Sequence, residues 1–288
     1  MATPDTGQLF PGKHFISTVL EALDSKTTMS GQLAQRYLQR AAMAGIIIGV
    51  FYTVNYTVIA AVVQVDPGLA PIGRLLGALA FGWALVFIYY SKSELLTSNM
   101  MIVSIGAYHR HTTLGKALRL LGLCFLGNFL GGLVVALLGA ASTVISGEVL
   151  TQMASSVEHK LDYISSGPTG WADLLVRAIL CNFMINLAML VVYNGIIKDD
   201  LTKSLAMIAS VFVFAFTGLE HSVANTVLFT VVGLREGIDV GLALGNVGIA
   251  LIGNFLGGGV LIGFYYAHAN DDRRYLAGHP APRQPRQT

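Results

Sequence analysis

Two short polar runs carry the residues that could do chemistry in an otherwise apolar chain. Glu220 and His221 are neighbours in the second run, and Glu94 stands in the first. An imidazole has a reference pKa of about 6.5, so it can exchange protons at physiological pH. A carboxylate at the end of a broken helix can accept hydrogen bonds from exposed backbone amides, and we favour that structural role for both glutamates over proton relay. The sequence predicts a functional intramembrane histidine at His221, with a purely structural histidine as the alternative.

An internal repeat relates the two polar runs. The block Gly127–Gly132 (GNFLGG) returns unchanged as Gly253–Gly258, 126 residues later. The same offset superposes two pairs of polar residues: Glu94 on Glu220, and Asn99 on Asn225. An identical offset at two separated places indicates that the chain contains two copies of one unit.

Composition indicates a membrane protein. Hydrophobic residues make up 54% of the sequence and charged residues 12%, whereas soluble domains carry about 25% charge. The net charge of +2 gives no reason to expect a nucleic-acid partner. Apolar stretches of suitable length predict six membrane spans, at residues 41–63, 75–107, 115–140, 172–193, 204–232 and 245–268.

The second and fifth spans are too long for one crossing and contain the polar runs, residues 91–99 and 217–225. Irregular backbone at membrane depth is tolerated only where it is buried in protein or lines a cavity. Three spans per copy is an odd number, so the second copy must enter the membrane from the opposite side. Inverted repeats are typical of channels and transporters, with the substrate site near the midplane. We therefore predict an all-α integral membrane protein with six transmembrane helices in a 3+3 inverted repeat, the second and fifth helices being interrupted.

Spans three and six contain residues suited to close helix packing. Asn128 and Asn254 are predicted to cap or bridge the backbone at the interruptions. Small-xxx-small patterns predict close helix contact at four glycines: Gly127, Gly131, Gly253 and Gly257.

The distribution of positive charge predicts the orientation. Thirteen of the 18 Lys and Arg residues fall on one side of the predicted spans and three on the other, so both termini are expected in the cytoplasm and the chain in the cell membrane. Residues 1–40 form a cytoplasmic segment whose residues 13–24 read as an amphipathic helix, lying on the membrane surface or on a neighbouring subunit. Residues 41–268 form the channel domain, with repeats at about 41–140 and 172–268. The tail, residues 269–288, is predicted to be cytoplasmic and disordered.

Four motifs on these spans resemble the formate/nitrite transporter family, which comprises pentameric channels for small monovalent anions with one pore per subunit. They occur in the family's order: Glu94-Leu95-Leu96-Thr97-Ser98, then Glu158-His159-Lys160, then Ala178 with Cys181-Asn182-Phe183 and Leu187-Ala188, then Gly218-Leu219-Glu220-His221-Ser222-Val223-Ala224-Asn225. The resemblance covers about residues 10–270 and implies an aquaporin-like architecture, although the Asn-Pro-Ala motif of aquaporins is absent.

The resemblance also implies roles for individual residues. It makes His221 the central pore histidine, Thr97 the hydroxyl facing it and Asn182 the polar residue beside them. Lys160 becomes the vestibule cation, braced by Glu220 and Asn225. The apolar constrictions fall on Phe81 and Phe214 on one side of the histidine, and on Leu85, Leu95 and Leu96 on the other. Two departures stand out, because the family usually has Phe or Ile at Leu96 and Gly at Lys92.

The function implied is a homopentameric channel for formate or related small monocarboxylates, in which an anion and a proton cross together as a neutral acid. Burying an isolated charge is very costly, and the pKa of an anion rises in a medium of low dielectric constant. Nitrite, hydrosulfide, lactate and acetate are alternative substrates, and a bare anion escorted by protonated His221 is the alternative mechanism. We expect no enzymatic activity, because no nucleophile, metal-ligand pair or cofactor motif accompanies His221.

Overall fold

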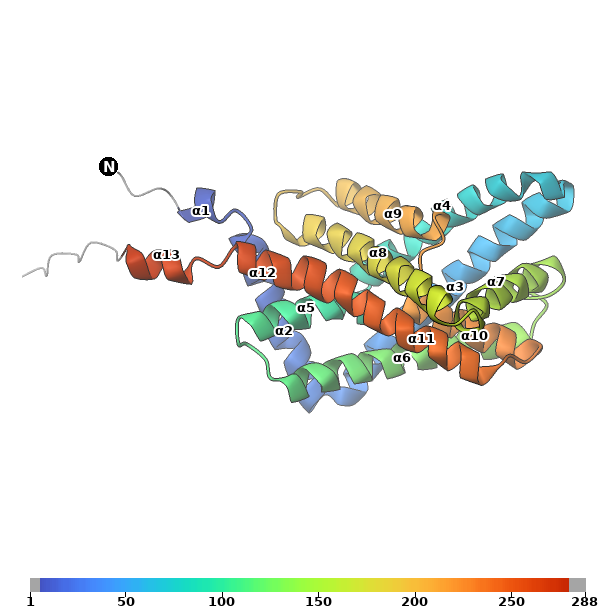
Figure 1. Cartoon of the computed structure of the whole chain (residues 1–288), viewed down its shortest axis with the longest axis horizontal. Coiled ribbons are helices and arrows are strands. Elements are labelled where there is room, and N and C mark those ends of the chain that lie inside the picture. Colours follow the sequence, from blue (N-terminus) through green and yellow to red (C-terminus); the bar gives the residue numbers. More distant parts are fainter. Residues whose placement is uncertain (1–5, 280–288) are drawn as a thin grey trace, which may run out of the picture.

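The computed structural model describes residues 6–279, and every regular element in that range is a helix (Figure 1). The predicted all-α class is therefore confirmed. In chain order the elements are α1 (Thr6–Leu9), α2 (Lys13–Gln32), α3 (Ala34–Val65), η1 (Pro67–Leu69), α4 (Ala70–Tyr90), α5 (Leu96–Tyr108), α6 (Leu114–Ala140), α7 (Glu148–Ser165), α8 (Pro168–Tyr193), α9 (Asp200–Phe216), α10 (Ser222–Arg235), α11 (Val240–Asn254), the π-helical η2 (Phe255–Phe264), α12 (Tyr265–Ala269) and α13 (Arg273–Gly278).

Several of these helices could cross a membrane. Within the described range, five helical segments are long and apolar enough: Ala34–Val65, Pro67–Tyr90, Leu114–Ala140, Pro168–Tyr193 and Val240–Gly278. The two spans predicted to be interrupted each consist of two helices, α4 with α5 and α9 with α10. The fifth predicted span is therefore absent from the five, since α9 has 17 residues and α10 has 14.

Backbone breaks separate α4 from α5 and α9 from α10, at the two predicted polar runs. At corresponding positions of the two breaks, Lys92 has a φ of 57° and Gly218 a φ of 68°. Glycine adopts this left-handed conformation freely, whereas a residue with a Cβ is destabilised there by roughly 1–2 kcal/mol. The glycine that the resemblance implies at position 92 would thus fit this backbone better than the lysine that stands there.

One asparagine bridges each break from a neighbouring helix, as predicted. Asn128 on α6 donates from Nδ2 to the carbonyl oxygens of Ala41 and Glu94, at 2.8 Å each. Its Oδ1 accepts from the backbone N–H of Leu96 at 3.1 Å. Asn254 at the end of α11 makes the three equivalent contacts in the second copy, at 2.8–2.9 Å. These bonds satisfy backbone groups that a broken helix would otherwise leave unpaired in an apolar interior.

Close approach of helices explains the small-residue patterns. A Cβ atom added to Gly131 would lie 1.9 Å from the carbonyl oxygen of Ala42, and one added to Gly257 would lie 2.0 Å from that of Ile179. These contacts bring α6 against α3, and η2 against α8. No side chain fits at such distances, so the packing role predicted for these glycines is confirmed.

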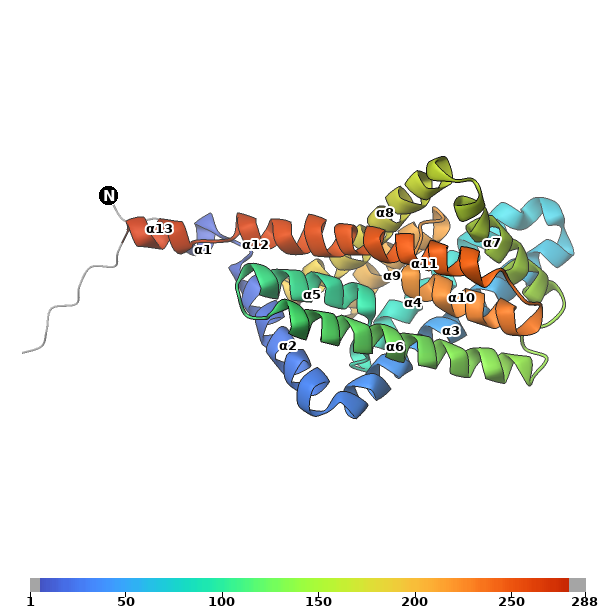
Figure 2. The same cartoon turned by 60° about the horizontal axis from the view of Figure 1, so that its bottom comes forward.

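The predicted N-terminal amphipathic helix packs its apolar side against its own chain. Phe15, Val19 and Leu23 on α2 are at most 1% exposed, and α2 contacts α3, α5 and α6. It lies at the same end of the molecule as α12 and α13, whereas α7 lies toward the opposite end (Figures 1 and 2). The apolar side of α2 is thus buried within one subunit.

The beginning of the C-terminal tail is ordered, contrary to the prediction of disorder from residue 269. Residues 273–278 form α13, and Asn270 accepts from the backbone N–H of Gly12 at 2.7 Å. Asp272 forms an ion pair with Lys13, and the Tyr275 ring lies 6.0 Å from that of Phe10. These contacts with the N-terminal segment, which composition does not reveal, hold the start of the tail. The rest of the predicted tail lies outside the described residues.

Candidate functional site

His221 stands at the junction of the two breaks, where it caps the N-terminus of α10. The backbone N–H of Ala224 donates to Nδ1 at 3.1 Å. Because an N–H can only donate, Nδ1 must be the acceptor, and the neutral ring carries its hydrogen on Nε2. Nε2 lies 3.1 Å from Oγ1 of Thr97, in the first turn of α5, and so donates to that hydroxyl. The capping bond thereby fixes the tautomer of a buried imidazole.

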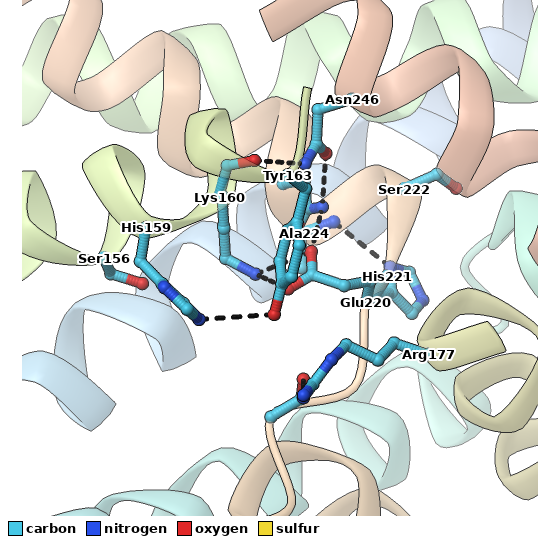
Figure 3. Close-up of polar contacts among 12 residues, drawn as sticks. Ser156, His159, Lys160, Tyr163, Arg177, Glu220, His221, Ser222, Ala224 and Asn246 are labelled. Carbon is cyan, nitrogen blue, oxygen red and sulfur yellow. Dashed lines mark hydrogen bonds and ion pairs between the residues drawn. The ribbon is translucent and has the colours of Figure 1, made fainter. Parts of the chain in front are cut away.

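On the α7 side of His221, a lysine, a glutamate and two asparagines form a closed cluster (Figure 3). Nζ of Lys160 lies 2.7 and 2.8 Å from the two carboxylate oxygens of Glu220. Asn225 donates to the same carboxylate at 2.6 Å and to Oδ1 of Asn246 at 2.9 Å. Asn246 in turn donates to the backbone carbonyl of Lys160 at 2.8 Å. Lys160, Glu220 and Asn225 thus lie together as expected. Asn246 is a fourth member of the cluster that was not predicted from the sequence.

The other half of the chain contains a second cluster of the same kind. Glu94 forms an ion pair with Lys26 of α2, and Asn99 donates to Glu94 at 3.0 Å. Lys26 was not among the residues predicted for the site. The 126-residue offset could not reveal it, because that offset places Ala34, not Lys26, opposite Lys160. The equivalence of the two glutamates was the available signal, since two symmetric buried carboxylates each require a cation.

Three cavities follow one another through the molecule. A cavity of about 660 Å³, here called the Lys160 vestibule, reaches His221 from the α7 side. A second cavity of about 300 Å³, the Lys26 vestibule, lies beside Glu94 and Asn99. Between them is a small apolar chamber of about 20 Å³. The chamber shares Phe81, Phe214 and His221 with the first cavity, and Leu85, Ile88 and Leu95 with the second.

Most predicted constriction residues form the walls of this chamber. The rings of Phe81 and Phe214 meet edge to face with centroids 6.0 Å apart, and the Phe214 ring stacks on His221 at 5.9 Å. Leu85 and Leu95 close the other side. A volume of about 20 Å³ admits roughly one water, so no ion could keep its hydration shell there.

Three predicted residues lie behind the cavities rather than on them. Leu96 is 2% exposed, and Thr97 and Asn182 are fully buried; none of the three lines either vestibule or the chamber. Leu96 was expected to form a constriction, but Leu95, which is extended at the N-cap of α5, lines the chamber, and Leu96, the first residue of that helix, does not. Asn182 donates to the backbone carbonyls of Thr97 at 3.1 Å and Asn254 at 2.6 Å. Its contacts thus position the backbone around Thr97.

Positive charge gathers in both vestibules. Lys92 and Arg40 line the Lys26 vestibule, and Arg74 and Arg177 line the Lys160 vestibule. Lys92, where the resemblance implies glycine, therefore lies on the path, with its Nζ 5.0 Å from the centroid of the Tyr89 ring. Within residues 6–279, no group of three His, Cys, Asp or Glu residues could hold a metal ion.

Known proteins are similar to this chain in sequence and in fold. A family model described as formate/nitrite transporter matches residues 13–268. The nitrite transporter NirC of Salmonella typhimurium is 29% identical, with 84% of each chain covered. The formate channel FocA of Haemophilus influenzae is 28% identical, with 72% of each chain covered. These relatives are named as transporters or channels, not as enzymes.

Solved structures agree on the fold. A structure titled "FNT family ion channel" has a TM-score of 0.75 and 24% identity, covering 90% of this chain and all of that one. Another, titled "Pentameric formate channel with formate bound", has a TM-score of 0.66 and 20% identity, covering 82% of this chain and 96% of that one. With its apolar helices, this is a multi-pass membrane protein, and it belongs to the formate/nitrite transporter family.

Proposed function

We propose that this protein is a channel for formate or a closely related small monocarboxylate, which crosses the central chamber as the neutral acid. The observation that carries the proposal is the series of cavities: two vestibules lined by cations, with an apolar chamber beside His221 that shares wall residues with both. Relatives named as formate channels and nitrite transporters support a small monovalent anion as the substrate.

The chamber favours a neutral species. An unpaired ion in a medium of low dielectric constant is destabilised by many kcal/mol, and the walls formed by Phe81, Phe214, Leu85 and Leu95 offer no charge to pair with it. Formic acid is small and uncharged, and its carbonyl oxygen can accept the Nε2 hydrogen of His221 in competition with the Thr97 hydroxyl. The substrate therefore gains a proton in a vestibule, loses its charge, passes the chamber and releases the proton on the other side.

The tautomer of His221 bears on where that proton comes from. Protonating Nδ1 would break the capping bond from Ala224, which is worth about 1 kcal/mol, and would place a charge among apolar side chains. Giving up the Nε2 hydrogen would leave an even less favourable imidazolate. We infer that His221 stays neutral and acts as a hydrogen-bond donor, while water in the vestibules delivers the proton.

The same proposal includes a topology of six crossings in two inverted copies. The paired breaks, paired bridging asparagines and paired Lys–Glu–Asn clusters all support a duplicated unit. The first and last described segments contact each other, as Phe10 and Tyr275 show, which is consistent with an even number of crossings. The excess of Lys and Arg near these segments favours a cytoplasmic location for both termini. The pentameric neighbour supports a homopentamer.

Substrate identity is tested by flux into proteoliposomes containing the purified protein. Formate, nitrite, hydrosulfide, acetate and lactate are compared at several pH values, with His221→Asn vesicles as the matched control. Saturable formate uptake that is faster at acidic external pH supports the proposal. Nitrite uptake without formate uptake would overturn the substrate assignment and leave the family unchanged.

A further inference from the structure

The Lys160 vestibule contains a polar side chain that nothing in the fold uses. Asn55 on α3 lines this cavity and is only 9% exposed. Its amide makes no hydrogen bond with any residue from 6 to 279. The side chain is seated over Gly77 of α4, where an added Cβ would lie 2.6 Å from Oδ1 of Asn55. Because Asn55 lines the cavity and no protein group pairs with its amide, a molecule that enters the cavity can supply the hydrogen-bond partner.

Arg74 supplies an uncompensated charge beside it. Arg74 lines the same cavity at its exposed mouth and has no ion-pair or hydrogen-bond partner in the described part of the chain. The other two cations of this vestibule are engaged, because Lys160 pairs with Glu220 at 2.7 Å and Arg177 pairs with Asp173 at 2.9 Å. Glu220 is the one carboxylate among the described residues that line the cavity. An anion entering here therefore meets Arg74 as its free cation.

Helix geometry places the two groups near each other. Arg74 precedes Gly77 by three residues on α4, so both lie on one face of the helix, about one turn or roughly 5 Å apart. The Asn55 amide rests on Gly77. An amide N–H and a guanidinium at this spacing suit the two oxygens of a planar oxyanion, because arginine binds carboxylates through paired donors.

The internal repeat does not account for either residue. The offset that superposes Glu94 on Glu220 places the acidic Asp200 at the position of Arg74. The two bridging asparagines donate to the carbonyls of Ala41 on α3 and Ala178 on α8, so these two alanines are equivalent positions of the two copies. Counting forward from them by the same number of residues, Asn55 on α3 corresponds to Val192 on α8. The duplicated architecture thus needs neither group, and their joint occurrence distinguishes this vestibule from the other.

We infer that Asn55 and Arg74 form an anion-capture subsite, which holds a small monovalent oxyanion such as a carboxylate before it reaches the Phe81–Phe214 constriction. This inference rests on the proposed function for the direction of travel beyond the subsite. It assigns the attraction of anions to Arg74 and leaves Lys160 as the partner of Glu220.

The first test is the concentration dependence of initial formate uptake. Arg74→Gln should raise the half-saturating concentration about tenfold, which corresponds to about 1.4 kcal/mol, with little change in maximal rate, because the charge that holds the anion is lost. Asn55→Ala should raise the half-saturating concentration about threefold. Asn55→Asp should raise it further, because the new carboxylate repels the anionic substrate. Arg235→Gln, which removes a cation outside the vestibule, is the matched control and should leave the concentration unchanged. Unchanged half-saturation in all three subsite variants would overturn the inference.

A second test restores the charge chemically. Arg74→Cys protein is treated with membrane-impermeant thiosulfonates that attach either a trimethylammonium or a sulfonate group. The native Cys124 and Cys181 are fully buried, so untreated and treated wild-type protein serve as controls. The positive reagent should recover uptake at low formate and the negative one should reduce it further; equal effects would contradict capture by charge. If wild-type protein moves no formate at all, the proposed function is wrong. If wild-type protein transports formate and the subsite variants have the same half-saturating concentration, only the subsite is refuted.

Discussion

Removing the charge of Lys160 should damage the protein mainly by leaving Glu220 unpaired. The two side chains are 9% and 3% exposed, and breaking a buried pair by deleting one partner costs about 3–5 kcal/mol. In Lys160→Met, the Glu220 carboxylate keeps the Asn225 amide at 2.6 Å but loses its only cation in the described structure. In the double variant Lys160→Met/Glu220→Gln, no charge remains buried, so most of the lost stability should return.

Thermal unfolding of the purified protein in detergent, combined with formate flux, measures both effects. The single variant should unfold roughly 10 °C below wild type, and the double variant should unfold within a few degrees of it. Lys116→Met, the matched control, removes one exposed lysine at the start of α6. It should leave both the unfolding temperature and the formate flux unchanged. A double variant as unstable as the single one would refute the reasoning. So would a single variant of normal stability with weakened formate affinity, which would return the anion-attracting role to Lys160.

Further variants test other contacts. His221→Asn should abolish formate flux yet unfold at a higher temperature than His221→Phe, because asparagine retains the cap on Ala224, worth about 1 kcal/mol. Leu95→Ala should raise flux of acetate relative to formate, while Leu96→Ala should leave this ratio unchanged, as measured in the same vesicles. Lys92→Gly should stabilise the protein by about 1 kcal/mol in thermal unfolding, since its φ of 57° favours glycine; a lower unfolding temperature would show that the lysine side chain matters more than the backbone.

The fold and the breaks could be predicted from sequence because their signals are local. Polar runs inside apolar spans identify the interruptions, and an exact repeat identifies Asn128 and Asn254 as equivalent. Each asparagine then bridges its break, as the repeated contacts show. Packing glycines were predictable for the same reason, since small residues four apart form a flat stripe on a membrane helix, against which a second helix can pack closely.

The features that the sequence did not predict depend on contacts between residues that are far apart in the chain or on the exact start of a helix. Lys26 reaches Glu94 from α2, 68 residues away, and no periodicity reveals which face of an amphipathic helix meets which break. Leu95 and Leu96 are equally apolar, and only the start of α5 determines which one faces the chamber. The ordered start of the tail depends on contacts with Gly12 and Lys13 at the far end of the chain.

The central claim is that formate crosses as the neutral acid beside a neutral His221. The most direct measurement records tracer flux and membrane current together, in planar bilayers containing the purified protein and a formate gradient. The proposed neutral-acid route predicts that acidifying one side accelerates flux from that side, while clamping the voltage changes the flux little and no matching current flows. Sustained currents comparable to the tracer flux, reversing near the formate equilibrium potential, would contradict the claim and establish passage of the anion itself.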